Sequence, residues 1–255
     1  MKVALFGRGR REEAQRNAAV PPGERVYAVG DVHGRFDLLQ QLLEEIEADD
    51  RARGPAETHV VMLGDLIDRG PDSAAIVDFF LSRLPSFARF HFVMGNHEEM
   101  LLTVLDDPAS PGLAHFLRFG GRETFESYRV PQRMLDLYED HASGDFASYV
   151  PDEHRTFLAG FADWVRIGDY LFVHAGVRPD VPLDEQVGAD LRWIRGSFLA
   201  SGADHGAMVV HGHTITAEPE MRANRIGIDT GAFASGVLTA LGLEGTERWL
   251  LQTGE

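Results

Sequence analysis

The sequence contains no cysteine, no long hydrophobic run and comparatively few basic residues. Without cysteine there is no disulfide framework, no thiolate nucleophile and no sulfur-ligated metal, so any metal must be held by oxygen and imidazole nitrogen. No apolar run approaches the roughly 20 residues that span a bilayer, and the opening MKVALFG is too short for the apolar region of a signal peptide. These absences predict a cytoplasmic protein without a membrane partner.

Acidic residues outnumber basic ones by 40 to 24, which gives a formal net charge of −16. Nucleic-acid binding requires Lys and Arg that displace counterions from phosphates, so a nucleic acid is not an expected partner. The length of 255 residues and the hydrophobic content of 44% suffice for one large domain, expected over residues 25–255. Residues 1–24 are rich in arginine and close on Pro21-Pro22-Gly23, and we expect a mobile N-terminal arm there, with a short strand at residues 3–6.

Five short apolar runs each end at a glycine followed or preceded by polar residues. They are RVYAVGDVHG (25–34), HVVMLGDLIDRG (59–70), FHFVMGNHEE (90–99), YLFVHAGV (170–177) and MVVHGHT (208–214). Helical patterns at 35–50 and 72–84 separate the first three, so the chain predicts an α/β fold with parallel strands and right-handed crossovers. Residues 100–165 are expected to be a helical insertion near the rim of the site, and the C-terminal segments to form an antiparallel β layer.

Polar side chains follow every one of these runs. In α/β sheets ligands collect beyond the carboxyl ends of strands, and we therefore expect the residues there to converge at one edge of one sheet. A single Asp after a strand is usually a cap or turn residue, and a single His is usually structural, but five such strand ends together predict a site. The residues are Asp31, His33, Asp65, Asn96, His97, His174 and His213.

Carboxylates gathered in this way repel one another unless a cation neutralises them. Carboxylate, carboxamide and imidazole ligands suit manganese, iron or zinc better than calcium, which prefers oxygen ligands alone. Two ions that share a carboxylate would use the whole set and would prepare a hydroxide for attack on phosphorus. The sequence therefore predicts two divalent metal ions, with manganese preferred and iron or zinc as alternatives.

The ordered motifs resemble those of the metallophosphoesterase superfamily. They are GDVHG (30–34), GDLIDRG (64–70), GNHE (95–98), VHAG (173–176) and HGHT (211–214). More narrowly, the set is similar to PPP-type serine/threonine protein phosphatases of the bacterial and phage, lambda phosphatase-like branch, to which GNHEEM, WIR and IDTGA also correspond. The resemblance covers about residues 25–232 and implies an α/β/β/α sandwich with mixed sheets.

The resemblance implies a role for each site residue. The first metal would be held by Asp31 and His33, the second by Asn96, His174 and His213, and Asp65 would bridge both. His97 would be the general acid and Asp68 would orient it. Phosphate would be bound by Arg69, Arg195 and Asn96, with Arg192 as the alternative to Arg195. The wider superfamily often ends its last motif in Gly-His-x-His, but Ile215 occupies that final position here, as in the protein-phosphatase branch, where the first metal has fewer protein ligands.

The leading functional expectation is a two-metal phosphomonoesterase, most specifically a protein serine/threonine phosphatase, with a phosphoprotein or phosphopeptide as its substrate. The alternative is a hydrolase of diadenosine tetraphosphate-like nucleotides, whose relatives have alanine in place of Asp68 and GNHD in place of GNHE. Two further hypotheses are less favoured: a non-catalytic protein that keeps metals for structure, and a metal-dependent nuclease, which the net charge of −16 opposes.

Overall fold

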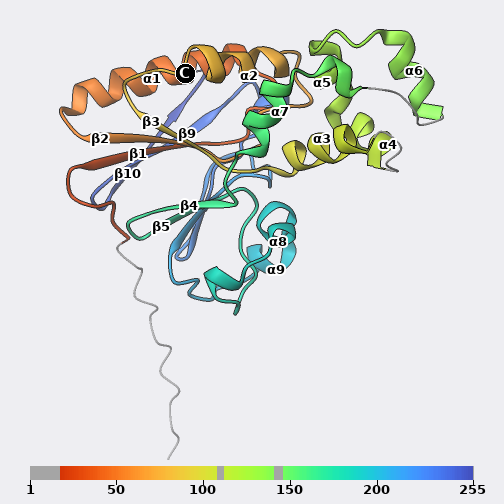
Figure 1. Cartoon of the computed structure of the whole chain (residues 1–255). Coiled ribbons are helices and arrows are strands. Elements are labelled where there is room, and N and C mark those ends of the chain that lie inside the picture. The colour runs from red at the N-terminus through yellow and green to blue at the C-terminus, as the bar shows by residue number, and fades with distance from the viewer. Residues whose placement is uncertain (1–17, 108–111, 141–145, 255) are drawn as a thin grey trace, which may run out of the picture.

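Two stacked five-stranded sheets form the middle of the structure (Figure 1). The structure is a computed structural model that describes residues 18–107, 112–140 and 146–254. The first sheet has the order β10 (Glu247–Gln252), β9 (Thr239–Glu244), β1 (Glu24–Val29), β2 (Glu57–Met62), β3 (Arg89–Phe92). Strands β1, β2 and β3 run parallel, with α1 (Phe36–Arg53) and α2 (Ser73–Ser82) as crossovers. The strand and helix alternation predicted for this part of the chain is confirmed.

The second sheet has the order β4 (Trp164–Ile167), β5 (Tyr170–Val173), β6 (Met208–His211), β8 (Arg225–Gly227), β7 (Glu220–Met221). Its three central strands are parallel and both edges are antiparallel. The expectation of a single sheet edge was therefore wrong, because β5 and β6 belong to this second sheet. The antiparallel pairing expected for the C-terminal segments is present in β9 and β10, which extend the first sheet beside β1, but not in β8, which pairs in parallel with β6 of the second sheet.

Three apolar clusters define the layers between these elements. Helices α1 and α2 pack on the outer face of the first sheet, where Leu42 and Met62 are fully buried. Val61 and Phe172 belong to the cluster between the sheets. On the outer face of the second sheet, α8 (Gly188–Trp193) contributes Leu191 and α9 (Gly196–Leu199) contributes Phe198 to the third cluster. This order of layers confirms the predicted α/β/β/α sandwich with mixed sheets.

A mostly helical segment follows β3 and lies at one end of the sandwich (Figure 1). It comprises α3 (Asn96–Asp106), α4 (Gly112–Phe116), the π-helix η1 (Leu117–Gly121), α5 (Arg122–Ser127), α6 (Gln132–Asp140), the 3₁₀-helix η2 (Ala147–Tyr149) and α7 (Asp152–Ala159). Two short elements remain, η3 (Leu183–Glu185) and α10 (Ala232–Ser235). Phe116 and Phe125 from this segment join the same apolar cluster as α1 and α2, so the segment packs against the sandwich.

The N-terminal prediction is corrected for its last residues. Ala18 and Val20 are each only 2% exposed and pack between the two sheets, and the Val20 N–H donates to the Gly245 carbonyl at 2.8 Å. An arm extending to residue 24 is therefore wrong, because residues 18–23 already contact the sandwich. Residues 1–17, with the strand expected at 3–6, lie outside the described residues. Over the described ranges, no helix combines the length and apolar character needed to cross a membrane.

Candidate metal centre

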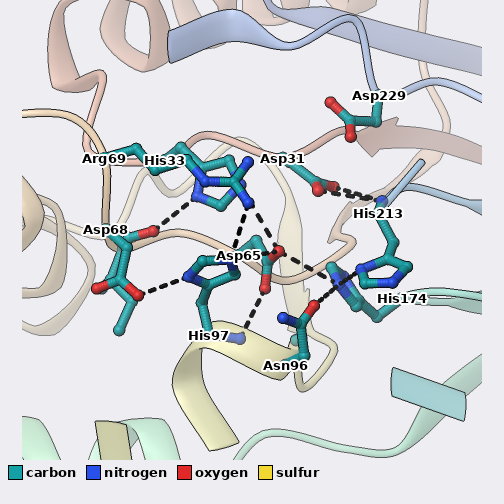
Figure 2. Close-up of polar contacts among 12 residues, drawn as sticks. Asp31, His33, Asp65, Asp68, Arg69, Asn96, His97, His174, His213 and Asp229 are labelled. Atoms are coloured by element: carbon teal, nitrogen blue, oxygen red, sulfur yellow. Dashed lines mark hydrogen bonds and ion pairs between the residues drawn. The ribbon is translucent and has the colours of Figure 1, made fainter. Parts of the chain in front are cut away.

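The loops that follow strands of both sheets meet at one place, where the predicted side chains converge (Figure 2). The first sheet contributes its residues from the loops after β1 and β2 and from the start of α3, and the second sheet contributes them after β5 and β6. All of them are at most 6% exposed: Asp31, His33, Asp65, Asn96, His97, His174 and His213. The predicted convergence therefore occurs, at the junction of two sheets rather than at the edge of one.

One group of ligand atoms surrounds the His174 imidazole. Its Nδ1–H donates to the Leu63 carbonyl at 2.8 Å, so Nε2 is the ring nitrogen that faces the other potential ligand atoms. This Nε2 lies 2.9 Å from Asn96 Oδ1, 3.2 Å from His213 Nδ1 and 3.3 Å from Asp65 Oδ2. Several electron-rich atoms thus face one another, and a bound cation would turn their repulsion into attraction. The donor set fits the expected second metal.

A second group centres on His33. Its Nδ1–H donates to the Ile67 carbonyl at 2.9 Å, which points Nε2 toward Asp65 Oδ2, 3.6 Å away. That Nε2 is buried and has no hydrogen-bond partner among the described residues. Asp65 belongs to both groups of potential metal ligands, as a bridging carboxylate must. Asp31 lies at the edge of the set, where its carboxylate accepts the His213 backbone N–H at 3.0 Å.

The ionisable groups of the site shift one another's pKa values. Burial raises the pKa of Asp65, but the neighbouring His174 and His97 outweigh burial and hold that pKa well below its usual range. For Asp31, burial and the nearby carboxylates of Asp229 and Asp65 raise the pKa well above its usual range. The two carboxylates expected to hold the metals therefore differ in electrostatic environment, and a cation beside Asp31 would favour its charged form.

Beside the ligand groups lies an acid–base pair. Asp68 Oδ2 is 2.6 Å from His97 Nδ1, and the other ring nitrogen of His97 lies 3.1 Å from the Arg69 guanidinium (Figure 2). Burial lowers the pKa of His97, but Asp65 and Asp68 outweigh burial and raise that pKa to about 9. His97 is thus positioned to carry a proton, and the predicted relation between Asp68 and His97 is present in the structure.

Thr124, a fully buried residue of α5, supports this pair and was not predicted from the sequence. Its hydroxyl donates to Asp68 Oδ1 at 2.5 Å, and it also accepts the Asp68 backbone N–H at 2.9 Å. The Gly120 carbonyl of η1 accepts the Arg69 N–H at 3.0 Å. The helical segment, expected only near the rim, therefore also positions the loop that carries Asp68 and Arg69.

Glu98 is a fully buried carboxylate whose hydrogen bonds lie at the start of α3 and in the loop after β2. Its carboxylate accepts the Gly95 N–H that begins α3 and also the N–H groups of Asp65 and Leu66, at 2.9 and 2.8 Å. Glycine is required at position 95, because a Cβ there would lie 2.2 Å from Asp65 Oδ1. Glu98 therefore joins the second and third loops of the first sheet.

A cavity of about 190 Å³ lies over the site. Its lining combines polar residues of the site with apolar side chains: Arg69, Asn96, His97, Met100, His115, Phe116, Phe119, Trp193, Arg195 and His213. Arg195 lines this cavity and has no side-chain hydrogen bond or ion pair within the described part of the chain. Arg192 instead pairs with Glu99 and Asp163. The structure therefore leaves Arg195, not Arg192, available to a ligand.

The backbone at the site is unusual. Seven non-glycine residues among those described adopt positive φ, and five of them belong to the site: His33 (47°), Asp65 (48°), Asp68 (73°), Arg69 (68°) and His213 (62°). This conformation is disfavoured for residues with a Cβ, and each instance costs about 1–3 kcal/mol. Strain concentrated in this way is typical of functional loops, where the surrounding structure enforces it.

Comparison with known proteins places these features in context. Residues 24–235 match the family model described as calcineurin-like phosphoesterase. Serine/threonine-protein phosphatase 1 of Salmonella typhimurium is 30% identical over 238 residues, which cover 90% of this chain and 97% of that protein. The symmetrical bis(5'-nucleosyl)-tetraphosphatase of Dechloromonas aromatica is 31% identical over 153 residues, or 60% of this chain. That match spans only 44% of the length of the tetraphosphatase.

The fold also occurs in solved structures. A crystal structure of a putative diadenosine tetraphosphatase aligns with a TM-score of 0.61 at 23% identity, and the alignment covers 92% of this chain and 98% of that one. At this identity the likeness concerns the fold alone.

Proposed function

Because the chain belongs to the calcineurin-like phosphoesterase family and is therefore a metal-dependent phosphoester hydrolase, we propose that it is a two-metal phosphomonoesterase acting on phosphoserine and phosphothreonine in proteins. The residues that would hold the ions are Asp31, His33, Asp65, Asn96, His174 and His213. When bound, the ions supply an activated water and neutralise phosphoryl charge. Manganese is the proposed metal, because imidazole and carboxylate donors suit it.

The observation that carries the proposal is the 2.6 Å contact between Asp68 and His97. A serine or threonine alkoxide is strongly basic and leaves phosphorus readily only if it receives a proton. His97 faces the cavity, and Asp68 fixes its ring and favours the protonated form. A nucleoside phosphate leaving group is weakly basic and needs no such acid, so the pair favours the monoester of an alcohol as substrate.

Phosphate binding is assigned to the two arginines of the cavity. The Arg69 guanidinium lies beside His97 and packs over the Phe233 ring, 4.7 Å from its centroid. Arg195 faces the same cavity from the start of α9. One guanidinium group can donate two parallel hydrogen bonds to two oxygens of a phosphate. Arg69 and Arg195 would therefore hold the phosphoryl group, and the Asn96 amide would also contact it.

The apolar residues that line the cavity favour the alternative substrate, a dinucleoside tetraphosphate. Met100, Phe119 and Trp193 line the cavity, and Phe119 and Trp193 are 51% and 39% exposed. Exposed aromatic rings can stack on a nucleobase. The same residues would also accept apolar side chains that flank a phosphoserine, so they do not distinguish a dinucleotide from a phosphopeptide. The Salmonella relative, matched over nearly its full length, supports the protein-phosphatase proposal.

The proposal is tested by kcat/KM of the manganese-loaded protein on a phosphoserine peptide, a phosphothreonine peptide and diadenosine tetraphosphate. We expect the peptides to be preferred by at least about tenfold. The matched variant is Asp68→Ala, which removes the carboxylate that accepts from His97 and from the Thr124 hydroxyl and leaves the ligand groups unchanged. It should lower kcat/KM on the phosphoserine peptide far more than on the dinucleotide. Preference of the wild-type protein for the dinucleotide would reverse the assignment.

A further inference from the structure

Asp229 is a buried carboxylate of the site that belongs neither to the two ligand groups nor to the acid–base pair. It follows β8 within the IDTGA motif, is 1% exposed and lies beside Asp31 and His213 (Figure 2). Its Oδ1 accepts the Gly231 N–H at 2.9 Å. Its Oδ2 is buried and has no hydrogen-bond partner in the described part of the chain. A carboxylate oxygen this deeply buried is unfavourable unless something positive or a hydrogen-bond donor faces it.

The backbone holds Asp229 in this place from both sheets. The Ile228 N–H donates to the His211 carbonyl at 3.0 Å, and the Asp229 carbonyl accepts the Thr216 N–H at 3.0 Å. On the other side, Gly30 of the first sheet packs so closely that a Cβ there would lie 2.7 Å from the Ile228 carbonyl oxygen. The position of Asp229 at the junction of the sheets is therefore a product of packing, not a chance orientation of a loop.

The carboxyl groups of Asp31 and Asp229 are thus buried close to one another (Figure 2). A pair of buried carboxylates is stable in its charged form only with a cation close by. At the same time, the first metal has few protein donors, because Ile215 stands where related motifs place a further histidine.

We propose that Asp229 completes the site of the first cation, where its Oδ2 accepts a hydrogen bond from a water ligand of the ion held by Asp31, His33 and Asp65. Carboxylates that bind in this way orient the ligands of an ion, and their removal typically lowers metal affinity about 10–100-fold. Asp229 is a positioning residue for the metal and does not contact substrate. This inference rests on the proposed two-cation site and is independent of which phosphoester is hydrolysed.

The test compares Asp229→Asn with the wild-type protein. Asparagine keeps the size of the side chain and the acceptor for the Gly231 N–H, whereas it removes the charge and replaces the Oδ2 acceptor with an amide donor. Isothermal titration with Mn²⁺ should show two ions on both proteins, with the affinity of one ion lowered about 10–100-fold in the variant. The Tm of the metal-free variant should equal or exceed that of the wild type, because one buried negative charge is gone, while the Mn²⁺-induced rise in Tm should shrink.

The control is Asp169→Asn, a remote carboxylate that also accepts one backbone N–H, from Ala19 at 3.1 Å. It should leave both Mn²⁺ affinities unchanged. If Asp229→Asn binds both ions as tightly as the wild type, or lowers the Tm of the metal-free protein without weakening Mn²⁺ binding, Asp229 has a structural role and the inference is overturned. If the wild-type protein itself binds no Mn²⁺, the two-cation site and the inference fail together.

Discussion

The two sheets contribute differently to the site. The first-sheet half, which consists of Asp31, His33, Asp65, Asn96 and His97, includes the bridging carboxylate and the candidate acid, and hydrogen bonds from Glu98 and Thr124 hold its loops. The second-sheet half consists of His174, His213 and Asp229, which offer only metal ligands or a carboxylate beside them. We therefore expect protonation of the leaving group to depend on residues of the first sheet alone, and metal retention to depend on both sheets. Bound cations would join the two sheets, and substitutions in the two halves should fail in different ways.

Asp65→Asn should have the largest effect, because Asp65 belongs to both groups of ligands. We expect the purified variant to lose bound metal, and its turnover of para-nitrophenyl phosphate to fall by more than about 10³-fold. Metal analysis after desalting, alongside the rate, checks both. Retention of two ions at wild-type stoichiometry would contradict the bridging role of Asp65. Asp65 would then not differ from residues that belong to only one ligand group.

His97→Asn should affect only the first-sheet half. Turnover of a phosphoserine peptide should fall about 10²–10⁴-fold, while para-nitrophenyl phosphate, whose leaving group needs little protonation, should be hydrolysed with a much smaller loss. Mn²⁺ stoichiometry should stay unchanged. Equal losses on the two substrates would show that His97 is not the acid.

His213→Ala should produce the opposite pattern. Removing one imidazole of the second-sheet half weakens metal binding, so excess Mn²⁺ should restore part of the rate, and equally on good and poor leaving groups. The Mn²⁺-induced rise in Tm should decrease, because stabilisation by a ligand follows its affinity. A loss that depends on the leaving group and that Mn²⁺ does not restore would show that the two halves are not separable.

Arg69→Ala and Arg195→Ala test the phosphate site that lies between the halves. Each change removes a charge-assisted hydrogen bond worth about 1.5–3 kcal/mol, so KM and the inhibition constant of inorganic phosphate should rise about 10–100-fold. Arg192→Ala is the control, because Arg192 pairs with Glu99 and Asp163. A larger rise in KM for Arg192→Ala than for Arg195→Ala would show that Arg192, not Arg195, binds the phosphate.

Thr124→Val should have the smallest effect on activity. It leaves the Asp68 N–H with Ser73 as its other acceptor but removes the donor to Asp68 Oδ1. We expect the free energy of unfolding to fall by about 1–3 kcal/mol, measured by urea denaturation, with only a modest loss of kcat. Unchanged stability would show that the helical segment does not support the first-sheet half.

The sequence predicted the convergence of the site better than the architecture that produces it. Asp31, Asp65 and His213 each follow a buried strand, and the carboxyl ends of parallel strands lead to a common place. Which sheet a strand joins was not readable, because strands such as β2 and β6 are buried on both faces and show the same continuous apolar pattern in either sheet.

Two site residues were missed for different reasons. Thr124 lies 56 positions from Asp68, and a threonine within a helix has no local pattern that reveals such a distant partner. Asp229 stood in a motif that had been noticed, but an aspartate after a short strand is ordinarily a turn residue. Its significance became apparent only when packing placed its unpaired oxygen beside Asp31.

The left-handed backbone at His33, Asp65, Asp68, Arg69 and His213 has a consequence for how this protein could diverge. Each of these positions lowers the stability of the fold and is retained only while hydrolysis is under selection. A descendant that became a pseudoenzyme would gain stability from glycine or asparagine at Arg69, the half-buried member of the set. In such a lineage, substitutions at the site residues should therefore appear before substitutions in the hydrophobic core, and a comparison of its sequences would show this order.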